Sequence, residues 1–186
     1  MPGAESGVPQ FTELPTELPT VLPAELRADC SRCAALCCVA PSFDAVQGFG
    51  FDKPAHSACP HLQADHRCGI HAELRPRGFP GCAVYDCHGA GQWVTQQFFA
   101  DQPWRLQPDG GRQQFEQFMR VRPLFELLML LTLALQRPGH DAALDEALRA
   151  LREELEQVQD EELNGHPLFN AMPWRERVFA LLRRLA

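Results

Sequence analysis

The residues of this chain that could do chemistry are concentrated in one stretch. All eight cysteines fall between Cys30 and Cys87. Thiolate sulfur is a soft donor that selects zinc, iron–sulfur clusters or Cu(I) over hard cations. Eight such donors indicate two four-thiolate sites, or one site with spare thiols. We therefore expect every cysteine to be a metal ligand: Cys30, Cys33, Cys37, Cys38, Cys59, Cys68, Cys82 and Cys87.

The first four cysteines follow the pattern C-x2-C-x3-C-C. Residues 24–39 contain neither proline nor glycine, so we expect a short helix there. On a helix, Cys30, Cys33 and Cys37 share one face, and Cys38 points about 100° away from Cys37, toward a second site or the core. Zinc knuckles usually place glycine in or just after the first pair. Ser-Arg and Ala-Ala-Leu stand here instead, which slightly favours an iron–sulfur cluster.

Five of the seven histidines lie in the same stretch. Imidazole is a common ligand of zinc, iron and copper. His71 and His88 are candidate additional ligands, because a nearby cysteine holds each of them close to sulfur. Donation of a hydrogen bond to a ligating sulfur is an equally natural role for these two. The other three are expected at the surface or outside the ligand shell, namely His56, His61 and His66.

The chain divides into four segments with different composition. We expect a Pro-rich linker over 1–23, a Cys-cluster metal-binding module over 24–92, a connecting segment over 93–114, and a helical segment over 115–186 that packs on the module. The predicted fold class is mainly α, with a small irregular loop-rich cysteine module followed by a C-terminal bundle of about three helices. Because a loop-rich module of this size has a poor hydrophobic core, we expect the metal to staple it.

Helix signals in the last segment are local. Pro123 is expected to begin a new helix, because proline is favoured at the first helical position, and Pro138-Gly139 ends it. Asp141 is expected to cap the following helix. The last helix is predicted from Pro173 to Leu185. The acidic outer face of the middle helix indicates a solvated surface.

Composition limits the partners and the compartment. The net charge of −7 argues against nucleic acid, which needs a basic surface, and no apolar stretch reaches the length of a membrane span. The start of the chain has no basic or apolar leader features, which favours a cytoplasmic setting where thiols stay reduced. A disulfide framework is the alternative, although adjacent Cys37 and Cys38 suit it poorly. The repeated Thr-Glu-Leu-Pro of the first segment is expected to be a tether, or a docking peptide for an unknown protein partner.

The cysteine pattern also resembles a known family. Residues 30–38, with Cys59, Cys68-Gly-Ile-His71, Gly81-Cys82 and Asp86-Cys87-His88-Gly89-Ala90-Gly91, resemble the YkgJ-type cysteine-cluster family, described as a zinc- or iron-chelating domain. More closely, residues 28–185 resemble the N-terminal region of actinobacterial proteins named for pentapeptide repeats, but without the repeats. His88 and His56 stand where relatives are expected to carry an aromatic residue and a glycine. The resemblance implies metal or iron–sulfur binding by the eight cysteines and supplies no substrate.

We therefore expect a protein that holds an iron–sulfur cluster, such as a 4Fe-4S cluster, or Zn2+ through cysteine thiolates. Its role would be structural, electron-transfer or accessory. One alternative is an iron–sulfur or metal-dependent enzyme of a modification or biosynthetic type, since some flagellin lysine methylases carry a similar cluster. The absence of a nucleotide-binding glycine loop, G-x-S-x-G and H-E-x-x-H favours a non-enzymatic role. A second alternative is a Cu(I) or zinc storage or chaperone protein.

Overall fold

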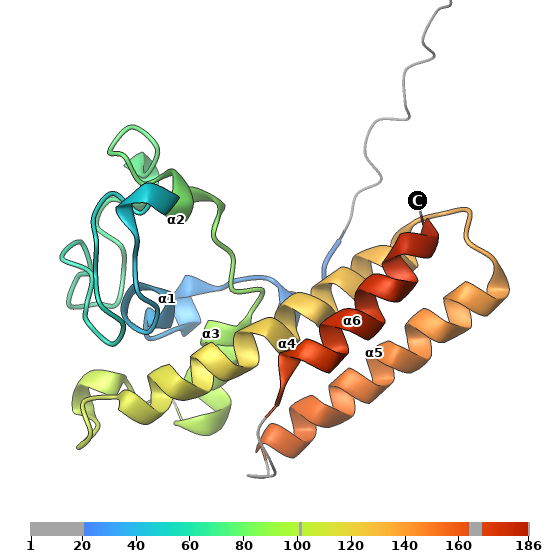
Figure 1. The fold of residues 1–186 in the computed structure, drawn as a ribbon. Helices are drawn as coiled ribbons and strands as arrows, with labels where there is room; N and C mark the ends of the chain where they lie inside the picture. Colours follow the sequence, from blue (N-terminus) through green and yellow to red (C-terminus); the bar gives the residue numbers. More distant parts are fainter. Residues whose placement is uncertain (1–20, 101, 164–168, 186) are drawn as a thin grey trace, which may run out of the picture.

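The computed structural model describes residues 21–100, 102–163 and 169–185. The predicted Thr-Glu-Leu-Pro tether lies outside these residues. The mainly helical class is confirmed, with a loop-rich cysteine region followed by a helical bundle (Figure 1). The α-helices of the described residues are α1 (Leu36–Val39), α2 (Pro80–Val84), α3 (Ala90–Trp93), α4 (Arg112–Gln136), α5 (Ala142–Leu163) and α6 (Ala171–Leu182).

The fold also contains 3₁₀ turns and one π-helical segment, most of them in or next to the cysteine region. A π-helical segment, Val94–Phe98, continues α3 directly. The described residues contain no strand, only two isolated antiparallel bridges that join Phe43 to Lys53 and Leu62 to Cys68. The 3₁₀ turns are Ala24–Leu26, Cys30–Arg32, Ala45–Gln47, His71–Glu73, Trp104–Leu106 and Arg183–Leu185.

Helix α4 links the two halves of the fold. Figure 1 shows α4 crossing from the cysteine region to the bundle, where α5 and α6 lie beside its second half. It contacts α1 and α3 as well as α5 and α6. Phe118, Leu124 and Leu131 of this helix are fully buried, because the cysteine region covers its first half and the bundle its second. Because α4 packs against both parts, it fixes the cysteine region relative to the bundle.

The prediction that Pro123 begins a new helix is wrong. Pro123 lies inside the continuous helix α4. An internal proline removes one backbone hydrogen bond and costs about 3 kcal/mol. The flanking residues Val121, Leu124 and Phe125 are all completely buried, and their burial outweighs that cost. Tertiary packing has overridden a local stop signal.

The other predicted helix boundaries lie close to the observed ones. The predicted cap is confirmed, since the Asp141 carboxylate accepts a hydrogen bond of 2.7 Å from the Leu144 backbone N–H. The last helix, α6, begins two residues earlier than predicted, because Asn170 caps it by accepting from the Met172 N–H at 3.1 Å. Its final turn, Arg183–Leu185, is 3₁₀ instead of α.

The single helix predicted over residues 24–39 is also wrong. The chain forms two 3₁₀ turns, Ala24–Leu26 and Cys30–Arg32, and then the short helix α1. Ala35, immediately before α1, has a φ of 58°, in the left-handed region that breaks a right-handed helix. Hydrogen bonds from distant residues hold the segment in this shape. None of the helices in the described ranges combines the length and apolar content that a membrane crossing requires.

Candidate metal centre

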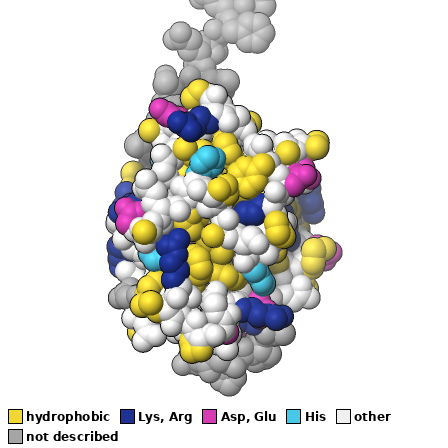
Figure 2. All heavy atoms as spheres, turned by 90° about the vertical axis from the view of Figure 1, so that its left-hand side faces the viewer, with side chains coloured by type: hydrophobic (Ala, Val, Ile, Leu, Met, Phe, Trp, Pro, Cys, Tyr) yellow, Lys and Arg dark blue, Asp and Glu magenta, His cyan; other side chains and the backbone are white. Residues whose placement is uncertain are grey.

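All eight cysteines line one cavity of about 380 Å³. They come from every part of the loop-rich region and from α1 and α2, and each is a free thiol. Figure 2 shows this side of the molecule, where hydrophobic side chains, coloured together with cysteine, gather in the middle of the face, with basic and histidine side chains among them. The lining sulfurs belong to Cys30, Cys33, Cys37, Cys38, Cys59, Cys68, Cys82 and Cys87.

Two polar side chains of the α3 region hold the segment that carries the first two cysteines. Buried Gln92 accepts from the Asp29 N–H at 2.7 Å and donates to the Arg27 carbonyl at 2.8 Å. Thr95 accepts from the Ala34 N–H at 3.1 Å. These bonds replace the missing helix of this segment and fix the backbone on both sides of the cysteines. Sequence reasoning missed both residues, because nothing near them signals a contact more than 60 positions away.

Gly91 lets two distant cysteines approach each other. A Cβ atom at Gly91 would lie 2.7 Å from the Cys33 sulfur and 3.6 Å from the Cys87 sulfur. The bare backbone of α3 therefore forms the floor beneath both sulfurs. Cys87 itself lies just before α3, where its carbonyl accepts from the Ala90 N–H at 2.9 Å.

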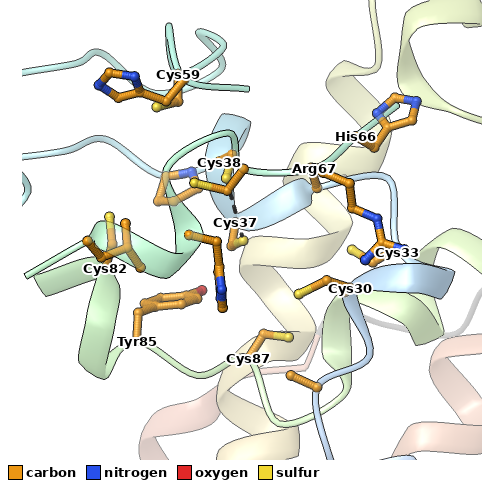
Figure 3. Close-up of a pocket in the computed structure, with 18 of the residues that line it drawn as sticks. Cys30, Cys33, Cys37, Cys38, Cys59, His66, Arg67, Cys82, Tyr85 and Cys87 are labelled. Carbon is orange, nitrogen blue, oxygen red and sulfur yellow. Dashed lines mark hydrogen bonds between the residues drawn. The ribbon is translucent and has the colours of Figure 1, made fainter. Parts of the chain in front are cut away.

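The neighbouring thiols of α1 are directed to different sides of the cavity. Their sulfurs are 4.0 Å apart. In Figure 3 the Cys38 sulfur lies on the side of Cys59 and Cys82, whereas Cys37 lies on the side of Cys30 and Cys87. The two sulfurs therefore contact each other while lying nearer to different sets of neighbours, and α1 contains only one turn of helix.

The later cysteines are held by a network centred on Lys53, the chain's only lysine. Its side chain is 5% exposed, and its ammonium group lies within hydrogen-bond distance of four backbone carbonyl oxygens, at 2.6–3.2 Å. Nearby, the Cys59 N–H donates to the Cys38 carbonyl at 3.0 Å. This buried cation therefore stabilises the loops beside both cysteines. The four carbonyl oxygens belong to Val39, Pro41, Pro54 and Ser57.

The electrostatics of the cavity oppose ionisation of most of its thiols. Burial raises the pKa of Cys33 to about 11. Burial, together with the nearby Cys38, Cys59 and Cys68, raises the pKa of Cys82 to about 11. Cys38 is the exception, because a hydrogen bond from the Cys37 thiol lowers its pKa. A site of this kind ionises fully only when a bound cation compensates the thiolate charge.

Tyr85 supplies a polar group that sequence reasoning did not single out. Its side chain lines the cavity, and its buried hydroxyl has no hydrogen-bond partner among the described residues. Burial raises the pKa of Tyr85, and the charges of Cys37 and Cys87 act in the same direction. A buried hydroxyl without a partner is costly, so this group is suited to donate to something held in the cavity. Figure 3 shows it directed toward the thiols.

The histidines that line the cavity are not the same as the two that the sequence suggested as ligands. His61, His66 and His71 line the cavity, although only His71 was a candidate ligand. His88, the other candidate, is not among the lining residues, and its Nδ1 lies 3.6 Å from an Asp86 carboxylate oxygen. The remaining histidine, His56, packs on Phe115 with ring centroids 5.5 Å apart.

The thiols that line the cavity have the chemistry of metal–thiolate ligands. Within the described ranges, no three Cys, His, Asp or Glu side chains are already positioned closely enough to hold a single ion. The thiols instead surround a common space that also receives the Tyr85 hydroxyl and the side chain of Arg67. Soft, deprotonatable donors around such a space are the ligands that zinc or an iron–sulfur cluster requires.

Comparison with known proteins gives a similarity to one bacterial sequence. The chain is 42% identical over 108 residues to the uncharacterized protein YybG of Bacillus subtilis (strain 168). The match covers 58% of this chain and 39% of that protein, so the chain spans well under half of its relative. No protein-family profile matches the chain, and no solved structure matches it.

Proposed function

We propose that this chain binds an iron–sulfur cluster through its cysteine thiolates. The observation that carries the proposal is that all eight cysteines, as free thiols, line one cavity of about 380 Å³. The thiols come from many separate loops, and packing alone does not require them to share one space. A common ligand would.

The size of the cavity favours a cluster over a lone zinc ion. Tetrahedral zinc brings its four sulfurs to within about 4 Å of one another, because each Zn–S bond is about 2.3 Å long. The inorganic core of a cluster is larger and keeps its thiolates farther apart. The cavity of about 380 Å³ that all eight cysteines line has room for the larger group.

The role that fits this site is structural, electron-transferring or accessory. A bound cluster would supply one-electron redox capacity and would cross-link the loops that carry the thiols. The chain's own residues provide the ligands, the buried Lys53 cation beside Cys38 and Cys59, and the Tyr85 hydroxyl. We further propose a YkgJ-type family membership and a reducing cytoplasmic setting, where such thiols remain available.

The test is anaerobic purification of the full chain, followed by a visible spectrum and quantitation of iron, acid-labile sulfide and zinc. We expect a brown protein with iron and sulfide in equal amounts. Cys33→Ser should lose at least half of the iron, whereas Ser42→Ala, which alters the cavity wall without removing a sulfur, should retain all of it. A colourless protein that takes up neither iron nor sulfide on anaerobic reconstitution would overturn the proposal.

A further inference from the structure

We propose that the eight cysteines form two separate four-thiolate centres that lie side by side. This inference rests on the proposed metal binding and assigns its ligands. The first set comprises Cys30, Cys33, Cys37 and Cys87. The second set comprises Cys38, Cys59, Cys68 and Cys82.

The first set is assembled on α3. Gly91 of this helix brings the sulfurs of Cys33 and Cys87 over the same backbone position. Figure 3 places Cys30 and Cys37 on this side of the cavity, with their sulfurs directed toward the same space. The Gln92 and Thr95 hydrogen bonds tie the segment that carries the first two cysteines to the helix that follows Cys87. The local architecture therefore joins both ends of the set.

The second set is assembled on the loops. Cys59 is bonded through its N–H to the Cys38 carbonyl, and the Leu62–Cys68 bridge folds the next loop back toward Cys59. Cys68 and Cys82 pack together against a small separate core of Ile70, Leu74 and Phe79. Each of the three later cysteines thus connects to Cys38 or to another member of the set.

The membership of the two hydrophobic clusters follows a similar division. Cys33, Cys37 and Cys87 pack against the main helical core, whereas Cys68 and Cys82 pack against the small loop core. Cys38 is the link, because it packs against the main core while its sulfur lies on the side of Cys59 and Cys82. Adjacent residues of one helical turn consequently supply one ligand to each centre.

Each set also has a cation beside it. Lys53 donates to the carbonyls of Val39 and Ser57, close in the chain to Cys38 and Cys59 of the second set. Figure 3 shows Arg67, which lines the cavity, on the side of Cys30 and Cys33 of the first set. Four thiolates around a divalent ion or a dicationic cluster carry a net negative charge. Two such centres in contact repel each other, and a separate cation beside each one reduces that repulsion.

The division is tested by counting centres in the full chain and in matched variants. Cys87→Ser removes a ligand from the first set and Cys82→Ser from the second. The proteins are reconstituted anaerobically with iron and sulfide and, separately, titrated with zinc in the metal-free state. We expect the native chain to hold about eight iron atoms if both centres are four-iron clusters, or two zinc ions. Each variant should lose half, and the double variant should lose nearly all.

Different failures point to different errors. A native chain that binds neither iron–sulfur clusters nor zinc overturns the metal-binding proposal itself. A native chain that binds one centre, lost in both variants, overturns the division while leaving metal binding intact. Complete loss of both centres in either single variant also overturns it. Because Cys87 packs against the main core, Cys30→Ser and Cys68→Ser repeat the comparison at other positions, with circular dichroism confirming the helical fold of each variant.

Discussion

At the scale of the residue, the most informative side chain after the cysteines is Lys53. It is a buried cation in a chain whose net charge is −7 and whose other 16 basic residues are all arginines. The compact ammonium group can be surrounded by carbonyl oxygens on several sides, which a planar guanidinium cannot. Lys53 therefore organises the loops around the second set in a way that arginine would not reproduce.

Replacement of Lys53 by methionine is expected to destabilise the metal-free protein by about 3 kcal/mol, because it leaves buried carbonyl oxygens without a donor. The four carbonyls that lose their partner are all backbone groups of the cysteine region. Urea denaturation measures the change. Arg75→Met, at an exposed position, removes the same charge and should change the stability by less than about 0.5 kcal/mol.

The same lysine allows a chemical check. An amine-selective acetylating reagent should modify Lys53 far more slowly in the folded protein than in urea. Since it is the only lysine, the modified site is unambiguous by mass spectrometry. Equal rates in the two states would contradict its burial.

At the scale of the element, α3 is short but decides where sulfurs can meet. Alanine is favoured over glycine in a helix by about 1 kcal/mol, so the sequence alone predicts that Gly91→Ala stabilises α3. The structure predicts weaker metal binding instead, because the new Cβ would lie 2.7 Å from the Cys33 sulfur. In the metal-free protein this sulfur can rotate away, whereas a ligating sulfur cannot.

We therefore expect Gly91→Ala to fold normally without metal and to lose the first centre, about half of the bound metal. Metal analysis after reconstitution and thermal melting of the metal-free protein measure the two effects. Gly69→Ala is the matched control, since its Cβ would meet only the flexible Gln63 side chain, at 3.2 Å. Full metal content in Gly91→Ala would be evidence against ligation by Cys33 and Cys87 together.

At the scale of the whole molecule, the two cores differ in size. The main core joins α4, α5 and α6 to α1 and α3, whereas the loop core contains only Ile70, Leu74 and Phe79 as buried residues. A core of three residues buries too little apolar surface to order so many loops alone. We infer that the bundle folds without metal and that the loops around the second set depend on it.

Metal removal by a chelator under reducing conditions is therefore expected to act unevenly. Amide hydrogen exchange should accelerate strongly in residues 41–84 and change little in α4 and α5. Circular dichroism should retain most of the helical signal. Equal acceleration of exchange in the loops and the bundle would show that the protein unfolds as one unit. It would contradict the inference that the bundle folds without metal.

Local sequence signals predicted the start of α5, the end of α4 and most of α6, because a helix is built from contacts three and four residues apart. The Asp141 cap and the end of α4 just before Pro138-Gly139 could be predicted for that reason. The residue types alone also showed that all eight cysteines lie between Cys30 and Cys87.

Only the tertiary structure decided the features that depend on distant contacts. Burial on both sides carried α4 through Pro123, and hydrogen bonds from Gln92 and Thr95 replaced the helix expected over residues 24–39. The proposed division of the cysteines also depends on such contacts, because cysteine spacing in loops does not specify which sulfurs meet. Chain folding brings Cys33 and Cys87 together at Gly91 and places the Cys38 sulfur on the side of Cys59 and Cys82. No local rule contains that information.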